Sequence, residues 1–247
     1  MNQTTSNHQI CLTERGFNQA RHAGQRLVTL LRENERVLVY TSPYKRARQT
    51  ANEITAVLRD SGVEYRTREE PRLREQDFGN FQGDQQEMQR IWMDRARYGH
   101  FFYRIPHGES AADVYDRCAG FNETLFRQFN SDKFPEVLVL VSHGIWARVF
   151  LMKWFRWSYE KFESLRNLRH CQFVVMECAD GAEEKRKYDL KTRLLTWDDQ
   201  DDSDDASIEE LEEASGGDVS VEDLKLIRAK EKKIKEQFKR ISNNIVA

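Results

Sequence analysis

The sequence is poor in cysteine and proline, and it has no long apolar run. Its 247 residues include four cysteines and four prolines. The cysteines form no C-x-x-C pair, which argues against a zinc cluster, and reduced thiols are a simpler interpretation than a disulfide framework. The longest apolar run, Val137 to Val141, is far too short to cross a bilayer. The polar start, Met1 to Ile10, lacks the apolar core of a secretory signal, so we expect a cytoplasmic protein.

Charge is distributed unevenly along the chain. The formal net charge is −2. Residues 198–218 hold eleven acidic and no basic side chains, whereas residues 219–247 hold eight basic and four acidic ones. Against the total of −2, these contributions of −11 and +4 leave +5 for residues 1–197. Such a small surplus suits a phosphate ester or another small anion and is too weak to predict nucleic-acid binding.

These differences divide the chain into three parts. Residues 1–197 are predicted to fold as one domain, and residues 198–218 to form a disordered acidic linker. Residues 219–247 are predicted to contain a basic helix with an imperfect apolar stripe. That helix is either solvated and loosely docked, or it contacts a protein partner or an acidic membrane surface.

Helical and strand patterns alternate within residues 1–197. The apolar spacing predicts helices over 12–33, 85–98 and 145–157, and two further helices that begin after Ser42-Pro43 and after Ser110. Ser42 is expected to cap the first of these two, and Ser110 with Asp113 forms a capping box for the second. Short runs rich in β-forming residues predict strands over 37–40, 63–65, 137–141 and 173–177. This alternation indicates an α/β fold with a mainly parallel sheet flanked by helices.

Two polar clusters follow strands of this sheet. One runs from Ser42 to Arg46 and the other from Ser142 to Gly144. Ligands of such sheets bind outside the carboxyl ends of the strands. Arg46, in the first turn of a helix, could grip a phosphate, and His143 could donate a hydrogen bond to the same group.

Glu75, in a loop between the two clusters, could protonate a leaving alcohol. Each residue also has an ordinary interpretation. Arg46 could be a surface arginine, His143 a satisfied core histidine and Glu75 a plain loop carboxylate. Taken one at a time, these ordinary roles are the more common ones.

Five segments, in order, resemble motifs of the histidine phosphatase superfamily. They are Leu12-Thr13-Glu14-Arg15-Gly16, Thr41 to Ala51 (TSPYKRARQTA), Leu73 to Gly79 (LREQDFG), Gly108-Glu109-Ser110 and Val139 to Gly144 (VLVSHG). One motif would be weak support, but five in the family's order are strong support. The stretches Phe78 to Gln82 and Ala111 to Arg117 are most similar to phosphoglycerate-mutase-like proteins of plants and fungi.

The resemblance implies a phosphoglycerate-mutase-like fold and phosphoryl transfer through a phosphohistidine. In that chemistry a phosphate ester is hydrolysed, or its phosphate transferred, without a metal or another cofactor. Carried over to this sequence, Arg46 and His143 hold the phosphate, and Glu75 is the general acid. Hydrolysis is expected rather than mutase action.

The sequence departs from the family at its start. Nothing before Leu12 reads Arg-His-Gly, the motif of the nucleophile, so that motif and the first strand would fall upstream of Met1. We expect that strand to lie beside residues 137–141, in the sheet interior. The chain is therefore predicted to be truncated or inactive, with little or no hydrolysis. The alternative function is non-catalytic binding of phosphate or a phosphoprotein.

Two histidines could substitute for the nucleophile. His107 precedes Gly108 and Glu109, but Pro106 stands where the motif has arginine. His8 lies in the polar N-terminal stretch. Both are more readily interpreted as surface histidines.

Overall fold

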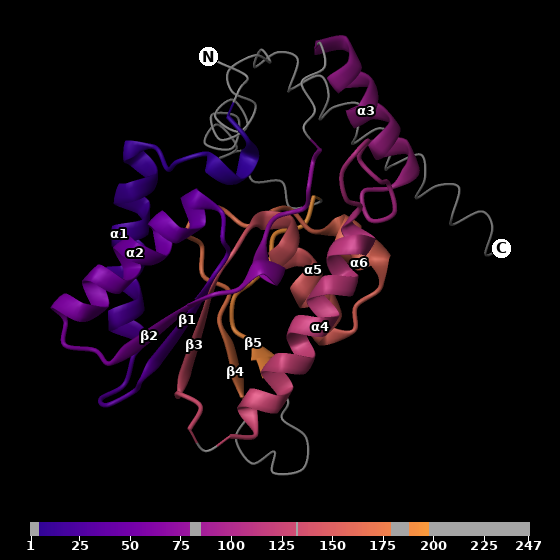
Figure 1. The fold of residues 1–247 in the computed structure, drawn as a ribbon. Helices are drawn as coiled ribbons and strands as arrows, with labels where there is room; N and C mark the ends of the chain where they lie inside the picture. Colours follow the sequence, from indigo (N-terminus) through magenta and orange to yellow (C-terminus); the bar gives the residue numbers. More distant parts are fainter. Residues whose placement is uncertain (1–4, 80–84, 132, 179–187, 198–247) are drawn as a thin grey trace. The chain divides into compact units, whose positions relative to one another are not determined.

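The computed structural model describes residues 5–79, 85–131, 133–178 and 188–197 (Figure 1). The acidic linker and the basic helix predicted after residue 197 lie outside the described residues. The described chain forms two compact units, one of residues 7–75 and 117–197 and one built around residues 76–116. No helix in these ranges is both long and apolar enough to cross a membrane.

The larger unit is built on a parallel three-stranded sheet. Its strands β1 (Val37–Thr41), β2 (Tyr65–Glu69) and β3 (Val137–Val141) are ordered β2-β1-β3. Val37 is in register with Val137, and Thr41 with Val141, so β1 and β3 end at the same level. The predicted parallel α/β architecture is confirmed, and β1 and β3 match their predicted ranges to within one residue.

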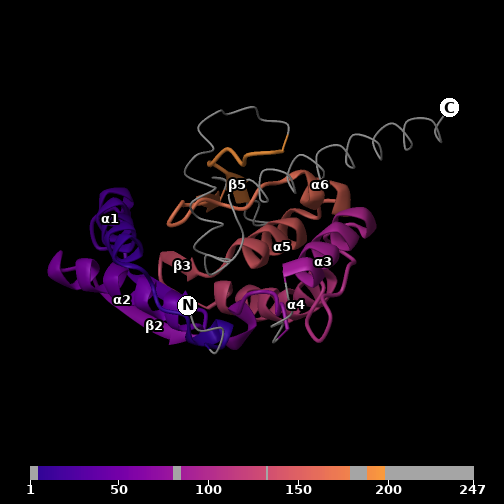
Figure 2. The same cartoon turned by 90° about the horizontal axis from the view of Figure 1, so that it is seen from above.

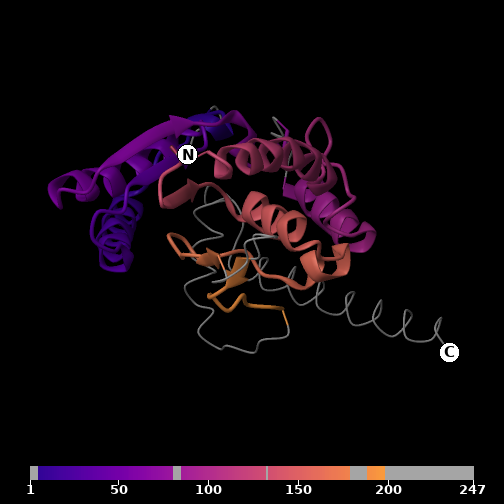
Figure 3. The same cartoon turned by 90° about the horizontal axis from the view of Figure 1, so that it is seen from below.

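Helices cover both faces of this sheet, as the views in Figures 2 and 3 show. On one face α1 (Glu14–Leu30) and α2 (Lys45–Asp60) pack against each other. Their apolar sides and those of the strands form one core cluster: Ala23, Leu27, Val37, Val39, Ala47, Ala51, Ile54, Leu58 and Val141. Val37 and Val39 alternate with Tyr40, so the two faces of β1 receive different partners.

On the other face, Tyr40 contacts α4 (Ala111–Phe129) and, through it, α5 (Gly144–Phe155). The Tyr40 ring lies edge-on to Phe121 at 5.7 Å, and the Phe121 ring meets Trp146 at 5.9 Å. The Tyr40 hydroxyl lies 3.0 Å from the amide oxygen of Gln128. The buried tyrosine thus has a polar partner for its hydroxyl, as buried tyrosines require. The short helix α6 (Tyr159–Ser164) follows α5.

The edge of β3 that faces away from β1 is unpaired among the described residues. β4 (Met176–Cys178) and β5 (Tyr188–Leu190) form a separate antiparallel pair. Since backbone groups alternate sides along a strand, Val137 and Val141 bond to the chain of β1, and Leu138 and Leu140 point their N–H and C=O groups the other way. This is the position where the sequence predicted a missing strand.

The smaller unit contains α3 (Gln85–Tyr98), whose range matches the prediction. Arg95 is buried there, 5.1 Å from the Trp92 ring, and donates to the Gln76 side-chain oxygen at 3.3 Å. The Glu109 N–H donates to the Asp77 backbone oxygen at 2.8 Å, and the Asp77 N–H donates to the Glu109 carboxylate at 3.0 Å.

Of the two caps predicted from the sequence, the capping box of α4 was predicted correctly and the cap of α2 wrongly. The Thr13 hydroxyl accepts from the Gly16 N–H, and Ser110 and Asp113 form the expected capping box. Ser42 does not cap α2. The helix begins later, at Lys45, with Tyr44 at the N-cap and no capping side chain. The predicted strands 63–65 and 173–177 are shifted towards the C-terminus, to β2 and β4.

Candidate active site

The two predicted polar clusters meet at one edge of the sheet. Because β1 and β3 are parallel neighbours in register, the residues that follow them emerge side by side. The Nη2 atom of Arg46, from the first turn of α2, lies 3.3 Å from Nδ1 of His143, the residue before α5. Arg46 and His143 are 97 positions apart in sequence, and the structure brings them into contact.

Arg46 is also held by a residue that sequence analysis did not single out. Its Nη1 atom donates to both the backbone and side-chain oxygens of Asn7, each at 2.9 Å. Asn7 belongs to the short 3-10 helix η1 (Asn7–Gln9). Burial lowers the pKa of Arg46, and the charge of Glu75 acts in the opposite direction. The guanidinium is therefore desolvated, and the oxygens it now binds occupy positions that an anion could take.

His143 is enclosed by polar and aromatic groups. Its Nε2 atom lies 2.8 Å from the Ser42 hydroxyl oxygen. The Tyr44 ring packs edge-on against it at 5.1 Å and contacts the His8 ring at 6.4 Å on another side. Burial, followed by the charges of Arg46 and Arg117, lowers the pKa of His143 well below its usual value. The imidazole is thus neutral at pH 7 in the unliganded protein.

Glu75 follows the 3-10 helix η2 (Pro71–Leu73) and is held at the start of α5. Its Oε1 atom accepts from the Trp146 backbone N–H at 3.2 Å. Such N–H groups in the first turn of a helix favour negative charge. The structure therefore places Glu75 beside the helix that follows His143, within electrostatic range of Arg46.

Arg117 fixes the loop that carries Glu75. It donates to the backbone oxygens of Arg72 and Arg74 at 2.8 Å each, and to that of Glu75 at 3.0 Å. The Ser142 hydroxyl adds a bond of 2.9 Å to the Leu73 oxygen. Arg117 lies in the stretch Ala111 to Arg117 that is similar to the plant and fungal proteins, but its sequence context predicted no role for its side chain.

The two substitute histidines lie in different units. His8 is exposed and next to Asn7, with its ring on Tyr44. His107 belongs to the smaller unit and has a left-handed backbone, with φ 59°. The ring of His8 therefore lies against Tyr44, which in turn packs on His143.

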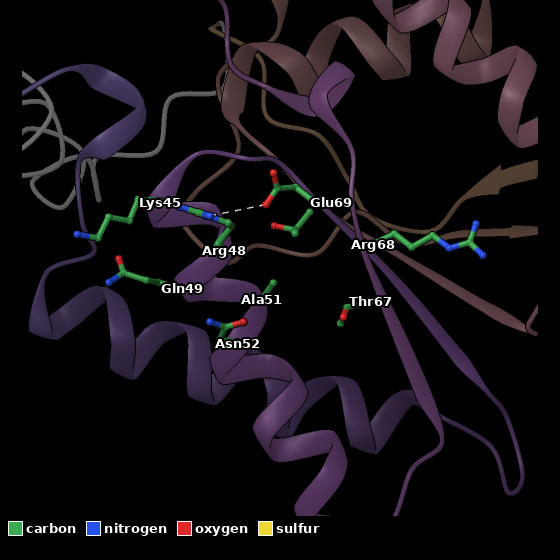
Figure 4. Close-up of a pocket in the computed structure, with 9 residues that line it drawn as sticks. Lys45, Arg48, Gln49, Ala51, Asn52, Thr67, Arg68 and Glu69 are labelled. Carbon is green, nitrogen blue, oxygen red and sulfur yellow. Dashed lines mark ion pairs between the residues drawn. The ribbon is translucent and has the colours of Figure 1, made fainter.

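A separate open cleft of about 360 Å³ lies between α2 and β2 (Figure 4). Lys45, Arg48, Gln49 and Thr67 line part of it. Arg48 faces Glu69 across the cleft at 3.8 Å, and the Gln49 oxygen accepts from the Leu12 N–H at 2.8 Å. Two of its polar side chains are therefore engaged within the protein. In the described ranges no cluster of three or more His, Cys, Asp or Glu residues could hold a metal ion.

Comparison with known proteins identifies the class to which this fold and site belong. Residues 2–190 match the histidine phosphatase superfamily (branch 1). The chain is a member of that superfamily, as its five motifs predicted.

Its relatives include phosphatases and phosphoglycerate-mutase-like proteins. It is 54% identical over 140 residues to the broad-range acid phosphatase DET1 of Saccharomyces cerevisiae, covering 56% of this chain and 41% of the yeast protein. It is 44% identical over 209 residues to the phosphoglycerate mutase-like protein AT74H of Arabidopsis thaliana, covering 78% of this chain and 74% of the plant protein. The chain thus spans less than half the length of the yeast relative.

Solved structures share the fold at low sequence identity. A mycobacterial glucosyl-3-phosphoglycerate phosphatase in complex with inorganic phosphate superimposes with a TM-score of 0.60 and 20% identity, over 79% of this chain and 92% of that one.

Proposed function

We propose that the site at the carboxyl ends of β1 and β3 binds the phosphate group of a small phosphate ester, and that the described residues do not by themselves complete its hydrolysis. The observation that carries this proposal is the contact between Arg46 and His143 at 3.3 Å, at the first turns of two helices. Neither N-cap residue, Tyr44 or His143, caps its helix with its side chain. The first N–H groups of α2 can therefore bind an anion, whereas at α5 the Trp146 N–H already binds Glu75.

Each residue takes a distinct part in binding. Arg46 turns its N–H groups from the oxygens of Asn7 to two phosphate oxygens, because a guanidinium fits a phosphate as a fork. His143 donates to a third oxygen. Glu75, when protonated, donates a hydrogen bond to the ester oxygen, the contact that general-acid catalysis would use if the ester were cleaved. Phosphate esters are supported as ligands by the phosphatases among the relatives.

Hydrolysis by the family route needs a second imidazole that attacks phosphorus. Among the described residues, the imidazole that contacts Arg46 is that of His143, and it is engaged on both ring nitrogens. We therefore propose that this chain hydrolyses phosphate esters weakly or not at all. We also propose a cytosolic location, supported by the four cysteines, all of which are free thiols.

Two measurements on the purified chain test the proposal. Calorimetric titration with inorganic phosphate is expected to give saturable binding, and p-nitrophenyl phosphate is expected to show little or no turnover. Absence of phosphate binding would overturn the assignment of the site. Robust turnover would overturn the proposed lack of hydrolysis. Loss of that turnover in His107→Ala or His8→Ala would identify the substitute nucleophile.

A further inference from the structure

The contacts of His143 determine which of its ring nitrogens carries the proton. Nδ1 lies 3.3 Å from Nη2 of Arg46. A guanidinium has only donors, so Nδ1 has to accept and cannot carry hydrogen. A neutral imidazole then holds its hydrogen on Nε2, which lies 2.8 Å from the Ser42 hydroxyl oxygen. Ser42 is therefore the acceptor in that bond.

Ser42 is well placed to act as a fixed acceptor. The residue is fully buried, with 0% exposure. Its backbone N–H donates to the Val141 oxygen at 3.0 Å, continuing the ladder between β1 and β3. The hydroxyl also accepts from the Tyr44 N–H at 3.3 Å, at the start of α2. Backbone groups of two elements thus hold the hydroxyl in place.

The position of the proton on His143 also argues against Ser42 as a nucleophile. A serine–histidine pair at 2.8 Å resembles a nucleophile beside its general base. A base must accept the hydroxyl proton, but Nε2 of His143 already carries a proton while Arg46 occupies Nδ1. The arrangement suits an anchor for the ring rather than an activated serine.

We propose that Ser42 is a positioning residue that accepts from Nε2–H and fixes the plane of the His143 ring, so that Nδ1 points at the phosphate site. This rests on the proposed function. When a phosphate oxygen takes the N–H groups of Arg46, Nδ1 loses its donor. Nδ1 then takes one proton from solvent and donates a hydrogen bond to the phosphate. The Nε2–H group remains hydrogen-bonded to the Ser42 hydroxyl oxygen.

Several charged or titratable groups near His143 affect its protonation. Arg46 of α2 and Arg117 of α4 oppose the extra proton on His143. The bound anion favours it, and Glu75, whose carboxylate lies at the first turn of α5, raises the pKa of the neighbouring Arg46. Tyr44 presents its ring to the imidazole. Because the anion neutralises the two guanidinium groups, proton uptake accompanies binding rather than preceding it.

Nitrogen NMR of the 15N-histidine-labelled chain tests the proposal without any ligand. The signals of His143, assigned by their loss in His143→Gln, are expected to show the Nε2–H tautomer in the wild-type protein. In Ser42→Ala the Nε2–H loses its acceptor, so its signal is expected to broaden through faster exchange with water, and phosphate affinity is expected to fall about tenfold. Ser42→Cys, which keeps the volume and a weaker acceptor, is expected to lie between the two.

Thr55→Val is the matched control. It removes another buried hydroxyl, which bonds to the Asn52 oxygen within α2 and does not contact His143. It is expected to leave both the Nε2–H signal of His143 and the affinity unchanged. An Nδ1–H tautomer in the wild-type protein, or an unchanged spectrum in both Ser42 variants, would overturn the proposal. Failure of the wild-type chain to bind phosphate would instead overturn the proposed function, because the tautomer is read in the free protein.

Discussion

Arg46→Ala is expected to weaken phosphate binding by roughly 100- to 200-fold. Arg46 presents two guanidinium nitrogens at the site, Nη1 towards Asn7 and Nη2 towards His143. A hydrogen bond to a charged group contributes about 1.5–3 kcal/mol. Losing two of them costs about 3 kcal/mol at the low end, and every 1.4 kcal/mol is about tenfold in affinity. The low end applies because burial already makes the guanidinium costly to keep charged, as its lowered pKa indicates.

Arg46→Lys separates charge from shape. A lysine keeps the positive charge but loses the planar fork, so it retains about one of the two bonds. The expected loss is about 1.5 kcal/mol, or roughly tenfold in affinity. Isothermal titration calorimetry with inorganic phosphate measures all variants under one buffer and salt concentration.

Arg48→Ala is the matched control for this prediction. Arg48 lies two positions further along α2, and its removal changes the net charge by the same amount. Its side chain is 52% exposed and faces Glu69 at 3.8 Å, a surface pair of small energetic value. We expect its affinity for phosphate to stay within about twofold of wild type. The reasoning is refuted if Arg46→Ala binds nearly as tightly as wild type, or if Arg48→Ala loses as much.

Three further predictions concern protonation and stability. Sulfate remains a dianion above pH 5, so its affinity reports protein groups: the pKa of His143 is low in the free protein and rises on binding. Protonated His143 therefore strengthens sulfate binding, and this contribution is fully present below the pKa of the free protein. It is lost as pH rises through the pKa of the complex, so the sulfate affinity falls about tenfold per pH unit between the two values. Calorimetry on His143→Gln should give a sulfate affinity that does not change with pH. Thr13→Ala should cost about 1 kcal/mol in urea unfolding, because the Gly16 N–H loses its cap. Leu58→Ala should cost about 2–5 kcal/mol in the same assay, because its side chain is fully buried in the core.

Sequence predicted the meeting of Arg46 and His143 for a clear physical reason. Each follows an apolar run that only a buried parallel strand explains, and parallel neighbours end at one edge. The element types and most helix ranges followed from periodicity in the same way. The exact start of α2 did not, because Ser42 had a competing partner in His143 that local sequence could not reveal.

Asn7 and Arg117 could not be predicted for different reasons. Asn7 lies in a polar stretch without periodicity, and its contact with Arg46 depends on where η1 packs. Arg117 bonds to three backbone oxygens, whose positions follow from the path of the loop rather than from side-chain chemistry. In a sequence such an arginine looks like any polar residue on a helix.

The edge of β3 that has no partner among the described residues has a consequence for the behaviour of the protein in solution. The strand reads Val-Leu-Val-Leu-Val, without charge, proline or glycine, and this composition is typical of segments that join strands of other chains into cross-β assemblies. Glu136 lies directly before β3 and forms an ion pair with Arg36 at 2.7 Å, so charged side chains lie next to the first residue of the strand. Partial opening of the sheet by heat or denaturant would expose Leu138 and Leu140 to neighbouring molecules. Aggregation, rather than reversible unfolding, would then set the temperature limit of this chain.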